Sequence, residues 1–140
     1  MKIKLDKGAY PLERAHPTDA GLDIRTPVAF DLYPGHSITI NTGVHIELPP
    51  MTCGLLVSKS GLNVKDGITS TGLIDEGYTG EIIVKLYNND PITAPYGRHF
   101  HRGAKISQLV VIPCAYPEVE IVDEIAGGPR GDDGFGSTGV

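Results

Sequence analysis

The sequence has little of several residue types, and each shortage excludes a class of protein. Among its 140 residues there is no tryptophan, and there are only two cysteines, Cys53 and Cys114. Two cysteines so far apart in the sequence do not make a disulfide framework, and neither belongs to a CxxC pair. We therefore expect both thiols to be free in a reducing compartment and to act as small core residues.

Long apolar runs and basic runs are also missing. No apolar stretch approaches the ~20 residues needed to cross a bilayer, and the first six residues lack the apolar core of a signal peptide. These absences predict a cytoplasmic protein with no membrane partner. The 12 basic and 17 acidic residues give a formal charge of −5. Without a Lys/Arg run, this charge argues against direct nucleic-acid binding but leaves room for a small anionic ligand.

The apolar residues that are present recur mostly with period two, which is typical of half-buried strands. Turn signals separate these stretches, in keeping with the 18 glycines and 11 prolines, and no stretch has a convincing helical period. The length suits one domain, and short strands at regular spacing predict an all-β sandwich or barrel. The expected strands cover residues 37–42, 44–48, 55–57, 81–87, 105–112 and 118–122.

The last residues, 126–140, differ in composition from the rest of the chain. They contain six glycines together with one arginine, one phenylalanine and an adjacent serine and threonine. Chain ends of this composition are commonly disordered. The arginine and the phenylalanine could instead grip an anion and stack on a ring, so a segment that becomes ordered over a ligand is the second interpretation.

Three segments carry residues suited to chemistry, and each has a plain structural alternative. Residues 58–62 could bind an anion through backbone N–H groups and a lysine, or could simply form a turn. In residues 72–80, Asp75 could act as a general base and Tyr78 as a flat surface for a sugar, or both could belong to an ordinary hairpin. Asp19 and Asp23 could serve Mg²⁺ through its waters, or could be solvated loop acids.

Other patterns of catalytic or metal sites are weak or missing in the sequence. His99 and His101 could form half a metal site, because alternate strand residues face one side, but no cysteine or third histidine is near in sequence. No GxSxG elbow, Walker loop or GxGxxG followed by a helix is present. The sequence therefore does not require a covalent nucleophile.

Taken in order, the segments resemble the five motifs of the trimeric dUTP pyrophosphatase (dUTPase) family. The matching segments are residues 20–24, 58–62, 72–80, 103–109 and 130–139, and the third and fifth are the most specific. The resemblance implies a jelly-roll-like β-barrel of the β-clip type over residues 1–125. It also implies a homotrimer in which the arm, residues 126–140, closes a site built by other subunits.

The resemblance further implies a reaction, the Mg²⁺-dependent hydrolysis of dUTP to dUMP and pyrophosphate. This reaction keeps uracil out of DNA and supplies dUMP for thymidylate. Asp75 would activate the water that attacks the α-phosphorus, and Asp23 would contact the waters around Mg²⁺. Tyr78 would pack against the deoxyribose and exclude a 2′-hydroxyl. A hairpin between Gly67 and Asp75 would read the uracil edge.

The remaining implied roles concern substrate binding. The residues implied at the uracil and sugar are Thr71, Gly72, Leu73 and Ile74, with Phe135 of the arm stacking over the base. The residues implied at the phosphates are Lys59, Ser60, Gly61 and Gln108, joined by Arg130, Gly136, Ser137 and Thr138 of the arm. The family usually has arginine where this chain has Lys59 and Lys105. Because lysine cannot make the planar bidentate contact of arginine, we expect the geometry of phosphate binding to differ from that of the family.

Three other readings of the sequence remain open. A dCTP deaminase-type enzyme on the same fold would need an acid–base glutamate, and Glu81 lies near the third motif. A nucleotide-responsive binding protein, as some phage-encoded members of the family are, would use a variable surface such as residues 88–102 for a regulatory protein partner. A lectin-like jelly roll would leave the motifs around Asp75 and Phe135 unexplained.

Overall fold

The computed structural model describes residues 1–90, 97–129 and 131, which form ten strands and one short helix. The elements are β1 Lys2–Leu5, β2 Leu22–Arg25, β3 Phe30–Leu32, β4 Ser37–Glu47, β5 Thr52–Val57, α1 Ser60–Asp66, β6 Ile68–Thr69, β7 Thr71–Ile74, β8 Glu81–Asn88, β9 Arg98–Phe100 and β10 Lys105–Pro113. Within this part of the chain no helix is long and apolar enough to cross a membrane.

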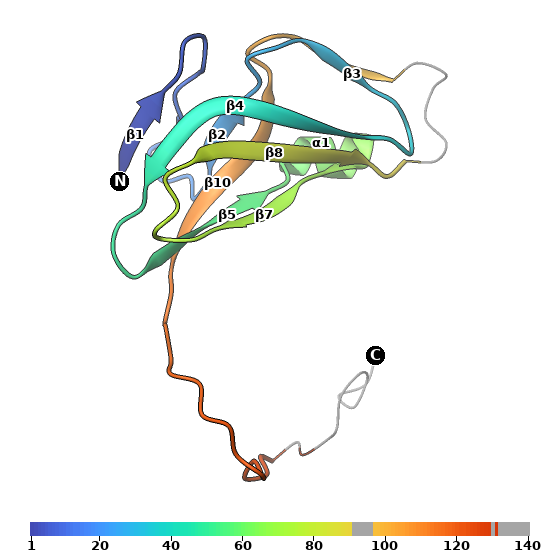
Figure 1. The fold of residues 1–140 in the computed structure, drawn as a ribbon. Coiled ribbons are helices and arrows are strands. Elements are labelled where there is room, and N and C mark those ends of the chain that lie inside the picture. Colours follow the sequence, from blue (N-terminus) through green and yellow to red (C-terminus); the bar gives the residue numbers. More distant parts are fainter. Residues whose placement is uncertain (91–96, 130, 132–140) are drawn as a thin grey trace.

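The strands form two four-stranded sheets and one two-stranded sheet (Figure 1). The first sheet has the order β1-β4-β8-β6 and the second has the order β2-β10-β5-β7, while β3 pairs with β9. All of the strand pairs are antiparallel. The expected all-β class is therefore confirmed, with the order of strands set by long-range pairing.

The core lies between the two larger sheets and follows directly from the period-two pattern. In β8, Ile82, Val84 and Leu86 are buried while the residues between them are exposed. They share one apolar cluster with residues of the second sheet such as Ile24 and Leu109. Each such side chain contributes roughly 1.5–3 kcal/mol when it is fully buried, so this cluster holds the two sheets face to face.

The two strands expected over residues 37–48 are a single strand, β4. The register with β8 shifts between Asn41 and His45, and Gly43 sits in the shift with a φ of 69°. A Cβ at Gly43 would lie only 2.8 Å from the Cβ of Ala9. Glycine permits both the left-handed backbone and this close approach, so the irregularity bends β4 without ending it.

The prediction that the chain has no helix is wrong at residues 60–66, which form α1. The helix has seven residues and none of them is fully buried, so its sequence shows no apolar stripe to reveal it. It ends at Gly67, whose left-handed conformation places its N–H on the carbonyl of Asn63. The helix thus begins directly at the Ser60 and Gly61 pair of the second motif.

The hairpin expected between Gly67 and Asp75 is also wrong in its pairing. Strand β6 pairs with β8 in the first sheet, whereas β7 pairs with β5 in the second sheet. The chain crosses between sheets at Ser70, whose buried hydroxyl lies 2.8 Å from that of Ser107. Crossing at this point places β7 beside the end of β5 that leads into the second motif.

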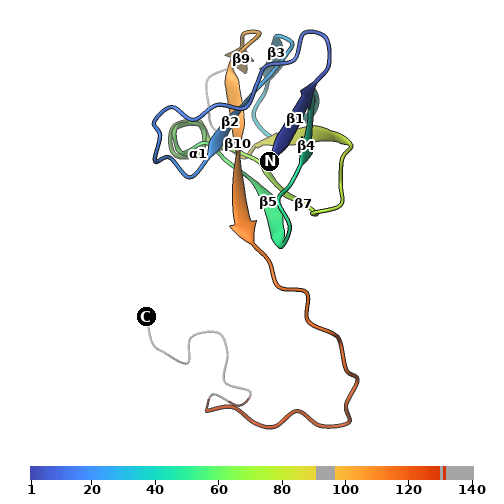
Figure 2. The ribbon, with the colours of Figure 1, turned by 90° about the vertical axis from the view of Figure 1, so that its left-hand side faces the viewer.

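The strand expected over residues 118–122 is absent from the structure of this chain. These residues alternate like a strand, but all of them are exposed, with Val119 at 90% and Ile121 at 97% of full exposure. After β10 the chain runs away from the sheets (Figure 2), so no neighbouring strand is there to pair with it.

The two cysteines are both free, as expected, but only Cys53 is buried. Cys114 is half-buried and follows β10, where its N–H donates to the carbonyl of Met51. Cys53 lies on the neighbouring strand β5. The two cysteines are therefore far apart in the sequence but close together in the fold. The expectation of two core cysteines therefore holds for one of them.

Candidate active site

The first and fourth motifs meet in one row across the second sheet, and the other two positions of the row directly precede the second and third motifs. The strand register places Asp23 opposite Gln108, Gln108 opposite Val57, and Val57 opposite Thr71. At about 4.8 Å between neighbouring strands, this row is roughly 14 Å long. Paired residues of an antiparallel sheet share a face, so the four positions lie on the same outer face of the sheet.

The first position of the row, Asp23, is a buried carboxylate held by two lysines. Its side chain is only 7% exposed, and its two oxygens are ion-paired to Lys59 and Lys105. Burial alone would raise the pKa of Asp23, but the hydrogen bonds from Lys105 and Lys59 outweigh it and lower the pKa. Asp23 is therefore ionised at neutral pH and fixes two ammonium groups at this end of the row.

Gln108 lies beside this cluster and is held by backbone groups. Its Nε2 donates to the carbonyl of Ser58 at 3.1 Å, and its side chain lies against the Cα of Gly21. Asp19, Gly21, Asp23, Lys59, Lys105 and Gln108 are among the residues that line a pocket of about 330 Å³. The pocket combines ammonium groups, an amide and carboxylates, which suits a phosphate chain accompanied by a cation.

The third motif forms a second pocket at the other end of the row. Asp75 is exposed directly after β7, where its carbonyl accepts from the N–H of Tyr78 at 3.0 Å. The Tyr78 hydroxyl donates to the carbonyl of Glu81 at 2.9 Å, and its ring covers Gly80 so closely that a Cβ there would lie 2.5 Å from the ring. Gly72, Leu73, Ile74, Asp75 and Tyr78 are among the residues that line this pocket of about 220 Å³.

The structure thus brings the expected site residues together as two groups. Asp23, Lys59 and Gln108 line one pocket, while Asp75 and Tyr78 line another, and the two pockets share no residue. Ser60 and Gly61 are exposed at the start of α1, beside Lys59, and Thr71 is exposed in the row. The residues expected from the arm, Arg130, Phe135, Gly136, Ser137 and Thr138, lie outside the described residues.

Glu81, the glutamate that a deaminase would need, has a structural role in this chain. Its two carboxylate oxygens accept hydrogen bonds from Asn41 Nδ2 and from the N–H of Gly43, each at 2.7 Å. These bonds fix the irregularity in β4 against the start of β8. Both oxygens are thereby engaged, which disfavours Glu81 as a proton-transfer group.

The contacts of Lys105 and Glu81 could not be found by sequence reasoning. Lys105 departs from the usual fourth motif, but nothing in the sequence pairs it with Asp23, which is far away along the chain. Only the β2–β10 pairing brings these two side chains together.

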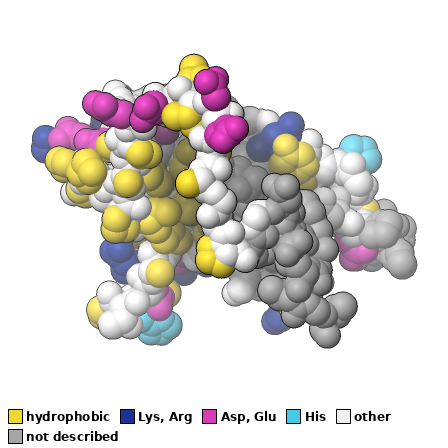
Figure 3. All heavy atoms as spheres, turned by 90° about the horizontal axis from the view of Figure 1, so that it is seen from below, with side chains coloured by type: hydrophobic (Ala, Val, Ile, Leu, Met, Phe, Trp, Pro, Cys, Tyr) yellow, Lys and Arg dark blue, Asp and Glu magenta, His cyan; other side chains and the backbone are white. Residues whose placement is uncertain are grey.

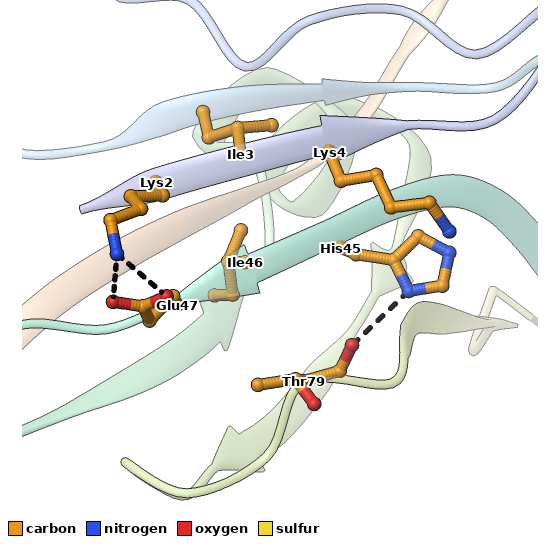
Figure 4. Close-up of a pocket in the computed structure, with 7 residues that line it drawn as sticks. All are labelled: Lys2, Ile3, Lys4, His45, Ile46, Glu47 and Thr79. Carbon is orange, nitrogen blue, oxygen red and sulfur yellow. Dashed lines mark hydrogen bonds and ion pairs between the residues drawn. The ribbon is translucent and has the colours of Figure 1, made fainter.

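Two further groups of side chains contain none of the expected site residues. A surface pocket lies along β1 and β4, where Lys2 pairs with Glu47 and His45 contacts the carbonyl of Thr79 (Figure 4). The rings of His99 and His101 lie 4.5 Å apart, and His99 Nδ1 lies 2.7 Å from an oxygen of Asp31. Among the described residues no group of three or more His, Cys, Asp or Glu could hold a metal ion.

Comparison with known proteins connects this arrangement to one family. A family model described as dUTPase matches residues 9–139. The deoxyuridine 5′-triphosphate nucleotidohydrolase of Gloeothece citriformis is 41% identical, covering 100% of this chain and 98% of that protein. The protein of the same name from Corynebacterium jeikeium is 42% identical, covering 99% of this chain and 91% of its own.

Solved structures agree with this match. The dUTPase of Staphylococcus bacteriophage 80alpha with dUpNHpp has a TM-score of 0.85 and 33% identity, covering 99% of this chain and 98% of its own. A dUTPase from phage phi11 of S. aureus, described with a structural Mg(II) ion, has a TM-score of 0.76 and 30% identity, covering 88% and 96%. The resemblance that the five motifs indicate is confirmed, and the chain belongs to the dUTPase family.

Proposed function

We propose that this protein hydrolyses dUTP to dUMP and pyrophosphate, with Asp75 activating the attacking water. The observation that carries the proposal is the row from Asp23 to Thr71. It brings Asp23 and Gln108 onto one face of one sheet, and its last position, Thr71, begins the strand that leads to Asp75. A nucleotide triphosphate has the same order of parts, an anionic chain at one end and an apolar sugar and base at the other.

Asp75 is suited to the role of general base. It is exposed directly after a strand whose last residue, Ile74, is buried, so its backbone is anchored at the edge of a pocket that it lines. A positioned carboxylate that accepts a proton from water contributes roughly 10²–10⁴-fold to a rate. Direct attack by water on the α-phosphorus needs no covalent enzyme intermediate, in keeping with a chain that has no nucleophile motif.

The phosphates would be held by the groups around the second and fourth motifs. Lys59 adds a positive charge at the entrance to α1, and the exposed Ser60 and Gly61 offer a hydroxyl and backbone N–H groups. Gln108 adds an amide. Catalysis in phosphoryl transfer is mostly positioning and stabilisation of charge, which is the work these groups can do.

The sugar and base would occupy the pocket beside Asp75. The Tyr78 ring is fixed by its hydroxyl contact to Glu81 and by the close approach to Gly80. A deoxyribose lying flat on a fixed ring leaves no space for a 2′-hydroxyl. The exposed edge of β7, from Thr71 to Ile74, would read the uracil through its backbone groups.

Magnesium would bind with the triphosphate rather than in a protein cage, and the donor set fits this mode. Asp23 is ionised, and the pKa of Asp19 in the same pocket is lowered by the hydrogen bond from the His16 backbone N–H. Carboxylates are the hard oxygen ligands that Mg²⁺ prefers, often through retained waters. Bound there, the ion would supply charge neutralisation to the phosphates, while Asp23 would accept hydrogen bonds from its waters.

The protein would act as a homotrimer with shared sites. Beside the polar row, the outer face of the second sheet is apolar: Leu55 pairs with Val110 and with Leu73, which is 64% exposed. Figure 3 shows hydrophobic side chains gathered on this side of the molecule. A second copy that covers the apolar part would meet the polar row at its edge. There the arm, residues 126–140, would add Arg130 and Phe135 to the site.

The test is pyrophosphate release from dUTP with Mg²⁺, measured beside dTTP, dCTP and UTP. Release from dUTP alone is expected, because the β7 edge has no room for the thymine methyl and the Tyr78 ring excludes the 2′-hydroxyl. Ammonia release from dCTP would instead identify a deaminase. Equal release from UTP would show that the Tyr78 ring does not exclude the 2′-hydroxyl.

A second proposed role is nucleotide-responsive binding of a regulatory protein inside the cell. It is supported by the similarity to the phage 80alpha dUTPase, because phage dUTPases are described as controlling the transfer of virulence genes. A pull-down with and without dUTP tests it. A partner captured in only one of the two conditions supports the role, and identical capture in both contradicts it.

A further inference from the structure

Glu76, the residue after Asp75, joins three separate parts of the chain through one oxygen. Its Oε2 accepts from the N–H of Met51 at 3.0 Å and from the Tyr116 hydroxyl at 2.7 Å. Met51 belongs to the turn before β5, and Tyr116 follows β10. Glu76 lies within the third motif but has no role in the proposed binding or chemistry, so these contacts call for another explanation.

The Met51 turn has an unfavourable backbone conformation that needs support from its contacts. Met51 has a φ of 59°, and it is the only non-glycine among the described residues with a positive φ. Such a backbone is strained for a residue with a side chain and persists only where its surroundings fix it. Here both polar groups of Met51 are fixed, its N–H by Glu76 and its carbonyl by the N–H of Cys114 at 2.9 Å.

The contact with Tyr116 is a hydrogen bond to a charged group. The hydrogen bond to Glu76 raises the pKa of Tyr116 to about 12, because ionising the phenol would place two negative charges together. Asp75, Glu76, Cys114 and Tyr116 line one pocket of about 650 Å³. The Glu76 contacts therefore lie at a pocket that Asp75 also lines.

Asp75 has no comparable support of its own. Within the part of the chain that the structure describes, no side chain donates a hydrogen bond to its carboxylate. Its position depends on its two neighbours, Ile74, which is buried in the core, and Glu76, which is tied to Met51 and Tyr116. The Tyr78 N–H also holds the Asp75 carbonyl, but releasing Glu76 would free the turn from the Met51 turn and from the segment after β10.

We propose that Glu76 is a positioning residue that holds the Asp75 turn against the Met51 turn and the segment after β10. The proposal rests on the proposed function of Asp75. A displacement of about 1 Å in a catalytic group can cost 10²-fold in rate. Loss of the Glu76 contacts is therefore expected to lower kcat much more than it changes KM, because Glu76 touches none of the substrate-binding groups.

The substitutions Glu76→Ala and Glu76→Gln separate positioning from charge. Because a single oxygen makes both contacts, the glutamine carbonyl oxygen can take its place and keep them. We expect Glu76→Ala to lower kcat by about 10–100-fold, with KM changed less than about threefold, and Glu76→Gln to stay within about threefold of the parent protein. Glu118→Ala, the same charge change at an exposed residue, is the matched control.

Wild-type turnover measured in the same assay distinguishes the two proposals. If the parent protein releases no pyrophosphate from dUTP, the proposed function fails. If it does, and Glu76→Ala keeps the parent kcat or Glu76→Gln loses as much as Glu76→Ala, the positioning role is overturned. Should Glu76→Ala fail to fold, Tyr116→Phe removes one contact and leaves the carboxylate in place. An unchanged kcat in Tyr116→Phe would then overturn the proposal.

A spectroscopic measurement checks the contact itself. Carbon-13 labelling of the tyrosine ring allows each phenol to be titrated by NMR between pH 9 and pH 11.5. With a pKa of about 12, Tyr116 should remain mostly protonated at pH 11 in the parent protein. In Glu76→Gln the charge is gone, so the pKa should move toward the ordinary tyrosine value of about 10. The same titration in both proteins would show that Glu76 and Tyr116 are not in contact, which overturns the proposal.

Discussion

Gly21 lies so close to Gln108 that a Cβ on Gly21 would be 2.3 Å from Oε1 and 2.9 Å from Cδ of the glutamine. Real Cβ atoms do not tolerate such contacts, so Gly21→Ala must push the Gln108 amide aside. The atoms that would clash are at the flexible end of the side chain, and the fold can therefore survive. We expect weaker dUTP binding with little change in melting temperature, measured by calorimetry and thermal denaturation.

A double-mutant cycle tells whether Gly21 acts through Gln108. If it does, Gly21→Ala should weaken binding in the parent protein but add little in a Gln108→Ala background, because the group that it displaces is already gone. Additive losses of affinity in the double variant would show that Gly21 has a separate role, such as approach of the backbone to the phosphates.

The carboxylate of Asp23 stabilises the fold as well as the pocket. Asp23→Asn would leave Lys59 and Lys105 without their counter-ion, and we expect the free energy of unfolding at pH 7 to fall by about 1–3 kcal/mol. The lower part of that range allows for the partial exposure of both lysines. Asp31→Asn, at an exposed acid that contacts His99, is the control and should change stability by less than about 0.5 kcal/mol.

The loss of unfolding free energy caused by Asp23→Asn should depend on pH in one direction. The pKa of Asp23 is lowered in the folded protein from an ordinary value of 3.8. The stability due to ionised Asp23 is therefore fully present above about pH 4, and it is lost as the pH falls through the lowered pKa. Urea unfolding of the parent and of Asp23→Asn should give curves that converge on acidification. A gap that stays constant down to pH 2 would contradict the ion pairs.

Removing the charge of Asp75 tests the proposed base directly. Asp75→Asn keeps the size of the side chain but cannot accept a proton from water, so turnover should fall by about 10²–10⁴-fold while dUTP still binds. Rapid-quench turnover and calorimetric binding measure the two effects separately. Near-parent rates in this variant would exclude Asp75 as the base.

The sequence predicts the long strands well because the burial of β4 and β8 alternates along enough residues to show a period. It fails where an element is short or lacks a partner. Strands of three or four residues such as β3 and β9 have too few positions to alternate, and α1 buries no side chain. Residues 118–122 alternate but meet no strand in this chain, so the pattern alone could not decide their structure.

The site was predictable where a motif is local and was not predictable where it depends on the register. The Asp75 and Tyr78 turn is read from nine consecutive residues, and the structure places both side chains on one pocket. Two other contacts join segments that are distant along the chain. They are the ion pair of Asp23 with Lys105 and the hydrogen bond of Glu76 with Tyr116. Only the antiparallel pairing around β10 brings those segments together.

The apolar outer face of the second sheet predicts how the protein assembles. Leu55→Asp would place a charge between Val110 and Leu73 in the middle of that face. If copies associate there, this variant should shift the mass measured by light scattering from trimer toward monomer. Val64→Asp, at an apolar residue of α1 that is 83% exposed, should leave the mass unchanged. A Leu55→Asp protein that remains a trimer would place the interface elsewhere.

Complementation decides whether each site is shared between subunits. Deleting residues 129–140 should cut turnover without lowering the melting temperature, because the core described above is built from residues between Leu12 and Leu109. The deleted protein keeps Asp75, and Asp75→Asn keeps the arm, so neither should be active alone. If Asp75 and the arm of one site come from different subunits, random co-assembly of the two proteins in equal amounts should restore about a quarter of the sites. If both come from the same subunit, the mixture must stay inactive, because no subunit then carries both functional parts.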